Sequence, residues 1–286
     1  MITLLWEYVI IKLMYLLFDI GGTKIRLAYS ADLKSFSEPI IEKTPANYND
    51  GLELLKEMFN RLDIDKSSLA AGGAPGPFNH QRTKMVNTIN LPDWKLRPLK
   101  DDLEKIFSCP VFLENDTAMV GLGEASFGAG RNSEIMSYFT ISTGVGGAKI
   151  VNKTIDETHL GFEPGHQIII LDENQQITEL EDLISGRQVS LKTGKKPYEI
   201  TDNDFWDKLA FYFACGLNNS LVHWSPDTVI VGGSMMKEPG LKIDRIIFHL
   251  KKVMKIFPEL PEIKKAELGD FGGLYGAMHY LVDKQI

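Results

Sequence analysis

A short glycine motif occurs twice in this chain, once in each half. Residues 21–25 read Gly-Gly-Thr-Lys-Ile and residues 146–150 read Gly-Gly-Ala-Lys-Ile, an offset of 125 positions. Both copies lie between two short apolar runs, so each predicts a strand, a glycine turn and a second strand. The placement of the copies predicts two related lobes, with a glycine turn of each lobe facing the cleft between them.

The remainder of the chain alternates short apolar runs with helical patterns. The runs that predict strands are 15–20, 25–29, 69–71, 111–113, 136–141, 148–151, 167–171 and 228–231. Apolar residues at helical spacing predict helices over 52–62, 205–221, 241–255 and 272–282, the first of them capped by Asn49 or Asp50. This mixture predicts the α/β class, and 286 residues are enough for two lobes that each bury a core.

Composition and charge narrow the function classes. The formal net charge is −7 with no block of Lys or Arg, which gives no support to a nucleic-acid surface. The two cysteines, Cys109 and Cys215, form neither a metal-type pair nor a disulfide framework. A reducing cytoplasm is therefore the expected location.

The first residues need a separate interpretation. Residues 1–14 are apolar but are interrupted by Glu7 and Lys12. They have no basic start and no small-residue cleavage site, so they do not resemble a secretory signal, and the charges disfavour a membrane span. We expect an N-terminal extension over residues 1–14, followed by a buried strand from Tyr15.

The first candidate site begins with an acidic residue at the end of a predicted strand. Asp19 closes the first predicted strand, and Gly21, Gly22 and Thr23 follow at once. Glycine lets backbone N–H groups approach an anion closely, so this turn is suited to phosphate, and Asp19 is placed to hold a hydrated magnesium ion. The alternative is a plain Gly-Gly hairpin. Neither the Walker phosphate loop nor the dinucleotide fingerprint is present.

Two more predicted strands end in glycine. Residues 142–147 carry hydroxyl side chains and three glycines between two strands, which suits the phosphates of a nucleotide. Gly232 and Gly233 directly follow the strand 228–231, as in a loop that passes close to a ligand. Each loop alone is weak evidence, but three such strand ends together indicate a nucleotide site.

A polar pair ends the strand at residues 111–113. Asn115 and Asp116 lie between this strand and a helical pattern. Asp116 could act as a general base at a cleft, with Asn115 as a hydrogen-bonding arm. The alternative is that one of the two caps the helix.

A carboxylate and an imidazole flank a Pro-Gly turn further along the chain. Glu163 and His166 could grip neighbouring hydroxyl groups of a ligand. A packed or exposed histidine, or a metal ligand, is the alternative for His166. Glu181, taken alone, reads as a solvated acid in the first turn of a helix.

Together these motifs resemble the ROK family (repressors, open reading frames and kinases), which includes bacterial glucokinases. The matching segments are 19–24, 73–77, 90–94, 114–116, 142–147, 163–166, 231–233 and 268–277. The resemblance implies an α/β, two-lobed, actin-like and hexokinase-like ATPase fold of the ribonuclease H-like type, with a central cleft. It also implies a small lobe over 15–115, completed by a C-terminal helix over 270–286, and a large lobe over 116–269.

The resemblance implies an ATP-dependent hexose kinase that phosphorylates the 6-hydroxyl of glucose, in the cytoplasm and in glycolysis, as a homodimer. Asp116 is then the catalytic base, and magnesium lies near Asp19. The implied sugar-binding residues are Asn90, Asn115, Asp116, Glu163, His166 and Glu181. The implied nucleotide-binding residues are Gly21, Gly22, Thr23, Lys24, Thr143, Gly144, Gly232 and Gly233.

Two departures from the family pattern matter. Zinc-bearing members carry three cysteines after the E-x-G-H motif, and this chain has no cysteine between Cys109 and Cys215, so we expect no zinc and a closer likeness to the zinc-free glucokinases. Family repressors carry a DNA-binding segment before the first phosphate motif, and the eighteen residues before Asp19 are too few for one. A kinase for fructose, N-acetylmannosamine or N-acetylglucosamine, and a non-catalytic sugar sensor, stay open as alternatives.

Overall fold

The computed structural model describes residues 14–64 and 66–284, and within them it contains two five-stranded sheets. The first sheet has the order β3-β2-β1-β4-β5, with β1 at Met14–Ile20, β2 at Lys24–Ser30, β3 at Ile40–Lys43, β4 at Ser67–Ala74 and β5 at Val111–Asn115. The second has the order β12-β11-β6-β7-β8, with β6 at Ile135–Ile141, β7 at Val145–Val151, β8 at Thr154–Ile155, β11 at Thr228–Gly232 and β12 at Glu262–Lys265.

The two sheets have the same topology. In the first, β1, β2 and β3 are antiparallel neighbours, and β4 and β5 continue the sheet parallel to β1. In the second, β6, β7 and β8 are antiparallel, and β11 and β12 continue parallel to β6. The prediction of two related lobes therefore agrees with the strand order.

The repeated glycine motif is nevertheless out of register between the lobes. Residues 21–23 form the turn between β1 and β2, but the corresponding turn between β6 and β7 is 142–144, and Gly146 and Gly147 lie inside β7. The expected glycine turn at 146–147 is therefore wrong. A Cβ on Gly146 would lie 2.7 Å from Oγ1 of Thr117, and one on Gly147 would lie 2.5 Å from Cγ of Pro164, so these glycines make room for neighbouring segments.

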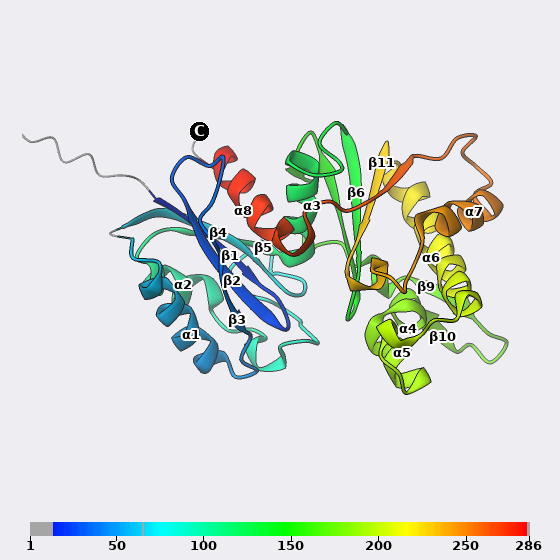
Figure 1. The fold of residues 1–286 in the computed structure, drawn as a ribbon, viewed down its shortest axis with the longest axis horizontal. Helices are drawn as coiled ribbons and strands as arrows, with labels where there is room; N and C mark the ends of the chain where they lie inside the picture. The colour runs from blue at the N-terminus through cyan, green and yellow to red at the C-terminus, as the bar shows by residue number, and fades with distance from the viewer. Residues whose placement is uncertain (1–13, 65, 285–286) are drawn as a thin grey trace, which may run out of the picture.

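Helices cover both faces of each sheet (Figure 1). On one face of the first sheet lie α1 (Tyr48–Arg61) and α2 (Leu99–Phe107), and α8 (Gly272–Asp283) covers the other. Helices α4 (Leu180–Ile184), α5 (Gly186–Thr193), α6 (Asn203–Trp224) and α7 (Ile243–Val253) belong to the second sheet's outer side. Helix α3 (Asp116–Ser126) packs against α8 and against β6 and β7, so these two helices join the sheets.

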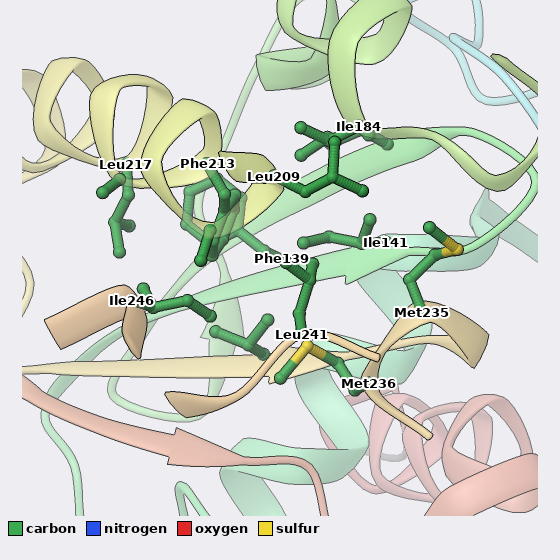
Figure 2. Packing of buried hydrophobic residues seen from close by; sticks show 14 of the residues in the cluster. Phe139, Ile141, Ile184, Leu209, Phe213, Leu217, Met235, Met236, Leu241 and Ile246 are labelled. Atoms are coloured by element: carbon green, nitrogen blue, oxygen red, sulfur yellow. The ribbon is translucent and has the colours of Figure 1, made fainter. Parts of the chain in front are cut away.

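Successive side chains of a strand point to opposite faces of its sheet, so each strand packs against the helices on both faces. In β1, Leu16 and Phe18 belong to the cluster beneath α1 and α2, while Leu17 packs with α8 on the opposite face. In the second sheet, Phe139 and Ile141 of β6 pack with Phe213 of α6 (Figure 2). These clusters fix the strand ends that carry the polar residues described below.

Most predicted elements are present, with local differences. All eight predicted strands are found, as β1, β2, β4, β5, β6, β7, β9 (Ile168–Leu171) and β11. The strands that the patterns missed are β3, β8, β10 (Ile177–Glu179) and β12, all of four residues or fewer. The cap of α1 is Asn47, whose side chain accepts from Asn49 and Asp50 N–H, so the predicted cap was wrong.

The expected extension falls mainly on residues 1–13, outside the described residues, and β1 begins at Met14. Among the helices of the described chain, none combines the length and the hydropathy needed to cross a bilayer.

Candidate active site

One cavity of about 900 Å³ is lined by residues of both sheets. Every residue that the sequence singled out for chemistry lines it: Asp19, Gly21, Gly22, Thr23, Lys24, Asn90, Asn115, Asp116, Thr143, Gly144, Glu163, His166, Glu181, Gly232 and Gly233. The fold brings these residues together because the ends of β1, β5, β6 and β11 all open onto the same space.

Asp116 is the first residue of α3 and follows β5 directly. Its carboxylate accepts a 2.7 Å hydrogen bond from the backbone N–H of Thr117. Burial, the charge of Asp19 and the charge of Glu163 raise the pKa of Asp116 to about 7, against the opposing effect of the Thr117 hydrogen bond. A carboxyl group with this pKa exchanges its proton near neutral pH, as a general base must.

Asn115 is the N-cap of α3. Its Oδ1 accepts from the N–H of Ala118 at 3.0 Å, and its Nδ2 donates to the carbonyl of Gly76 at 3.1 Å. The capping alternative is therefore correct for Asn115. An amide has two donor hydrogens and two acceptor lone pairs, so the same side chain retains capacity for a ligand.

Asp19 is buried at the end of β1 and forms an ion pair with Arg26 at 2.8 Å. Burial raises the pKa of Asp19 more strongly than the Arg26 charge and hydrogen bond lower it. The patterns missed Arg26, although it also lines the cavity. The hairpin register could have found it, because Asp19 and Arg26 are directly opposed across β1 and β2.

Close contacts tie the first glycine turn to its surroundings. A Cβ on Gly22 would lie 2.9 Å from Cβ of Asn90, so the predicted nucleotide residue touches a predicted sugar residue.

A second close contact lies between β4 and the start of α3. A Cβ on Gly73 would lie 2.7 Å from Cα of Asp116. Glycine at this position of β4 therefore allows α3 to begin directly beside the sheet.

Glu181 joins the second glycine loop to α5. Its Oε2 accepts from the N–H of Val145 at 2.8 Å, and its Oε1 accepts from Nη2 of Arg187 at 3.2 Å. Two backbone bonds run beside it: the N–H of Gly186 donates to Ser142 at 2.7 Å, and that of Arg187 donates to Thr143 at 3.3 Å. Glu181 is therefore not the freely solvated acid of the local interpretation.

Glu163 directly precedes the 3₁₀ turn at Pro164–His166, and His166 is the last residue of that turn. Desolvation raises the pKa of Glu163, with Glu181 adding to the effect and His166 opposing it. Nδ1 of His166 lies 2.7 Å from Oε2 of Glu179. Burial alone would lower the pKa of His166, but the Glu179 hydrogen bond and the neighbouring carboxylates outweigh burial and raise it.

Gly232 is the last residue of β11, Gly233 follows it, and both line the cavity. Gly233 has φ of +97°, and a Cβ there would lie 2.2 Å from the carbonyl oxygen of Ile141, so only glycine fits. Cationic residues that the patterns did not single out also line this region, namely Lys237 and Lys265. No short motif marked either lysine.

In the described part of the chain, no group of three or more His, Cys, Asp and Glu side chains is arranged to hold a metal ion. The expected absence of zinc stays a prediction. A magnesium ion in a kinase commonly uses one or two carboxylates together with phosphate oxygens, which does not require such a group.

Two sheets of matching topology, with a glycine-lined cavity between them, define the class of actin-like, hexokinase-like ATPase folds. Residues 15–284 match the model of the ROK family, and the chain belongs to that family. This finding confirms the resemblance drawn from the motifs.

Known relatives cover nearly the whole chain. The glucokinase of Streptomyces coelicolor is 25% identical over 303 residues, covering 91% of this chain and 94% of that protein. The N-acetyl-D-glucosamine kinase of Pectobacterium atrosepticum is 26% identical over 302 residues, covering 92% and 97%. A ROK family glucokinase from Streptomyces griseus, crystallised with glucose and AMPPNP, has the same fold, with a TM-score of 0.78 at 24% identity and coverage of 93% and 98%.

Proposed function

We propose that this protein is an ATP-dependent hexose kinase that transfers the γ-phosphoryl group to the 6-hydroxyl of glucose. The observation that carries the proposal is Asp116, a carboxylate with a pKa of about 7 that lines the same cavity as three glycine-rich strand ends. Family membership and relatives named as sugar kinases support the same activity.

Asp116 would accept the proton of the 6-hydroxyl. The sugar oxygen forms its bond to the γ-phosphorus, and the bond from that phosphorus to the bridging oxygen of ADP breaks. The products are a hexose 6-phosphate and ADP, and Asp116 then releases its proton to solvent. In phosphoryl transfer the protein does little covalent chemistry itself, so positioning and electrostatic stabilisation provide most of the rate acceleration.

The sugar would be held by its hydroxyl groups in the part of the cavity nearest Asp116. The residues assigned to this task are Asn90, Asn115, Glu163, His166 and Glu181. A site that hydrogen-bonds several hydroxyls rejects an analogue that lacks one, because its own polar groups are then left unpaired.

The phosphates would lie against Gly21, Gly22 and Thr23 on one side and against Thr143 and Gly144 on the other. Gly232 and Gly233 would approach the nucleoside, with Lys24 near the phosphates. Asp19 fits a magnesium ion bound through water or phosphate, because its carboxylate lines the cavity and its charge raises the pKa of Asp116, an effect that a cation would offset. When bound, magnesium neutralises charge on the phosphates.

The second candidate is a kinase for another hexose, such as N-acetylglucosamine, N-acetylmannosamine or fructose. Its support is that the named N-acetyl-D-glucosamine kinase and glucokinase relatives are almost equally similar to this chain, at 26% and 25% identity. The preference depends on the shape of the cavity around the sugar's second carbon.

From the family resemblance we also propose that the protein is cytoplasmic, forms a homodimer and acts in glycolysis. The division into lobes at 15–115 and 116–269, with residues 270–286 returned to the first lobe, is also a proposal, supported by the packing of α8 on β1 and β4.

A coupled assay of ADP release with a panel of hexoses tests the proposal. The panel is glucose, fructose, N-acetylglucosamine and N-acetylmannosamine, with 6-deoxyglucose as the control acceptor. We expect the highest kcat/KM with glucose and no turnover of 6-deoxyglucose. The D116N variant should lose about 10²- to 10⁴-fold in kcat while still binding glucose. ADP release that no hexose accelerates would rule out the kinase.

A further inference from the structure

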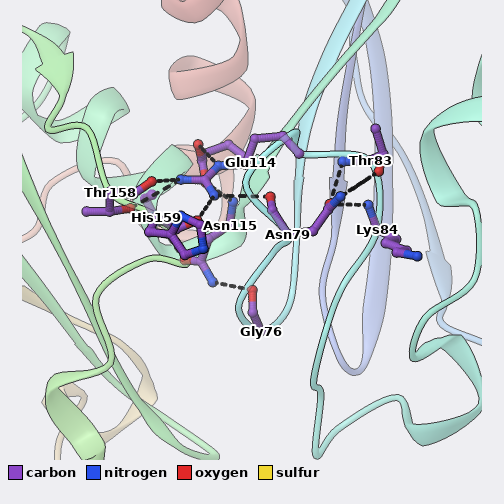
Figure 3. A network of polar contacts seen from close by, with 10 residues as sticks. Gly76, Asn79, Thr83, Lys84, Glu114, Asn115, Thr158 and His159 are labelled. Atoms are coloured by element: carbon purple, nitrogen blue, oxygen red, sulfur yellow. Dashed lines mark hydrogen bonds and ion pairs between the residues drawn. The ribbon is translucent and has the colours of Figure 1, made fainter.

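A hairpin of the first lobe extends toward the second. Phe78 and Met85 form an antiparallel bridge at its base. At its tip, Oδ1 of Asn79 accepts from the N–H groups of Thr83 and Lys84 at 2.9 and 3.0 Å (Figure 3). Arg82 occupies this tip in the left-handed region, at φ of +53°. The Asn79 bonds therefore hold the backbone of this tip, from which the Arg82 side chain reaches both Glu114 and the second lobe.

The Arg82 guanidinium bonds to both lobes at once. Nε donates to Oε2 of Glu114 at 2.9 Å, at the end of β5. Nη2 donates to the carbonyl and to the hydroxyl of Thr158, both at 3.2 Å, and Nη1 donates to the carbonyl of His159 at 3.4 Å. Thr158 and His159 lie in the second lobe, between β8 and the Pro164–His166 turn.

Both ends of this bridge lead to the cavity. On one side, Oε1 of Glu114 accepts from the N–H of Asn115 at 2.8 Å, immediately before Asp116. On the other side, Thr158 lies five residues before Glu163 in the same loop. Arg82 itself is not among the residues that line the cavity. It therefore acts on the site only through the groups that it holds.

A second contact between the lobes lies at the same place. The rings of His80 and His159 stack with centroids 5.1 Å apart. The pair of Arg82 and Glu114 is shielded, with side-chain exposures of 18% and 9%. A planar guanidinium with donors in a fixed fork can bond to acceptors on three residues at once, whereas a lysine ammonium acts as a point charge.

We propose that Arg82 is a positioning residue that holds the Glu163 loop of the second lobe against the Asp116 end of β5, and so assembles the sugar half of the active site. The inference rests on the proposed function for the identity of the ligand, but the bridge itself concerns the free protein. R82K is the informative variant, because it keeps a cation beside the buried Glu114 while losing the fork that reaches Thr158 and His159.

Amide hydrogen exchange on the ligand-free protein tests the bridge without any sugar. In R82K we expect the amides of Asp156 and His166, which donate to Lys149 and Glu163 at the two ends of this loop, to exchange faster by on the order of tenfold. R97K is the matched control, because Arg97 pairs with Asp93 within one lobe, and its exchange should equal wild type. Unchanged exchange at Asp156 and His166, or a change confined to residues near Glu114, would overturn the inference.

Calorimetric titration with glucose and with a non-hydrolysable ATP analogue tests the consequence. We expect R82K to weaken glucose binding by about tenfold or more, with the affinity for the analogue unchanged. Faster exchange with unaltered glucose affinity would overturn the positioning role. If wild-type protein binds none of the hexoses, the proposed function fails, while the exchange result still decides whether Arg82 bridges the lobes.

Discussion

The carboxylate of Glu181 accepts a hydrogen bond from the backbone N–H of Val145 at 2.8 Å. Val145 directly follows the glycine loop assigned to the phosphates, and Glu181 is assigned to the sugar. The same carboxylate also pairs with Arg187 at 3.2 Å. One side chain therefore contacts both halves of the proposed site, so a change at Glu181 itself should affect both.

The first prediction concerns this connection. E181A removes both a proposed sugar contact and the acceptor of the Val145 N–H. A hydrogen bond to a charged group contributes about 1.5–3 kcal/mol. We therefore expect the KM values for glucose and for ATP each to rise about tenfold. Initial rates with each substrate varied in turn measure this. E199A is the control, because Glu199 is exposed and bonds the N–H of Lys196 away from the cavity. An unaltered KM for ATP would contradict the connection.

A second prediction uses the glycine beside Glu181. A Cβ on Gly144 would lie 2.6 Å from Oε2 of Glu181, so G144A should push the carboxylate away from Val145. We expect G144A to raise both KM values in the same way as E181A. Because E181A already removes the carboxylate that the added Cβ would displace, the double variant should be little worse than E181A alone. Additive losses in a double-mutant cycle would show that the two residues act independently.

The pH dependence of turnover follows from the pKa of Asp116, which is about 7. A general base works only as the carboxylate, so kcat/KM for glucose should fall as pH drops below about 7 and level off above it. Rates across pH 5.5 to 8.5 in one mixed buffer check this expectation. The residual activity of D116N should lose this inflection. A wild-type profile that is flat through this range would exclude Asp116 as the base.

The free energy of unfolding should change with pH in the opposite sense to the activity, because of the same Asp116 carboxyl. The folded-state pKa of Asp116 is raised above the ordinary 3.8, so the folded protein binds this proton more tightly than the unfolded chain does. The contribution of Asp116 to stability is therefore greatest at low pH and is lost as pH rises from about 4 to about 7. D116N removes this penalty and should raise Tm at pH 8 but not at pH 4. Thermal melts at both values decide, and a Tm at pH 8 below wild type would refute the argument.

Local patterns singled out residues that the fold gathers at one cavity. A strand ending in an acid or a glycine turn is recognisable from a few consecutive residues, as at Asp19, Asp116 and Gly232. When four such strand ends occur in an α/β chain, they gather at one cavity because the sheets place them there. The family resemblance added the order of the motifs and the assignment of roles.

The repeated glycine motif predicted two related lobes correctly, although its two copies do not occupy equivalent positions in them. The lobes do share one strand order, but the turn that matches Gly21 and Gly22 is at 142–144, while Gly146 and Gly147 are strand residues. Their glycines are required by contact with Thr117 and Pro164, segments that are distant in sequence. A similarity of five residues cannot distinguish a glycine needed for a turn from one needed for close packing.

The amino-acid sequence alone predicted the types of the elements, the two-lobed class and the residues at the strand ends. Each of these depends on periodicity or on a few adjacent residues. Tertiary structure alone decided the bond between Glu181 and Val145 and the reach of Arg82 to Thr158. The same is true of the pKa of Asp116, since desolvation and the charges of Asp19 and Glu163 depend on distances that folding sets.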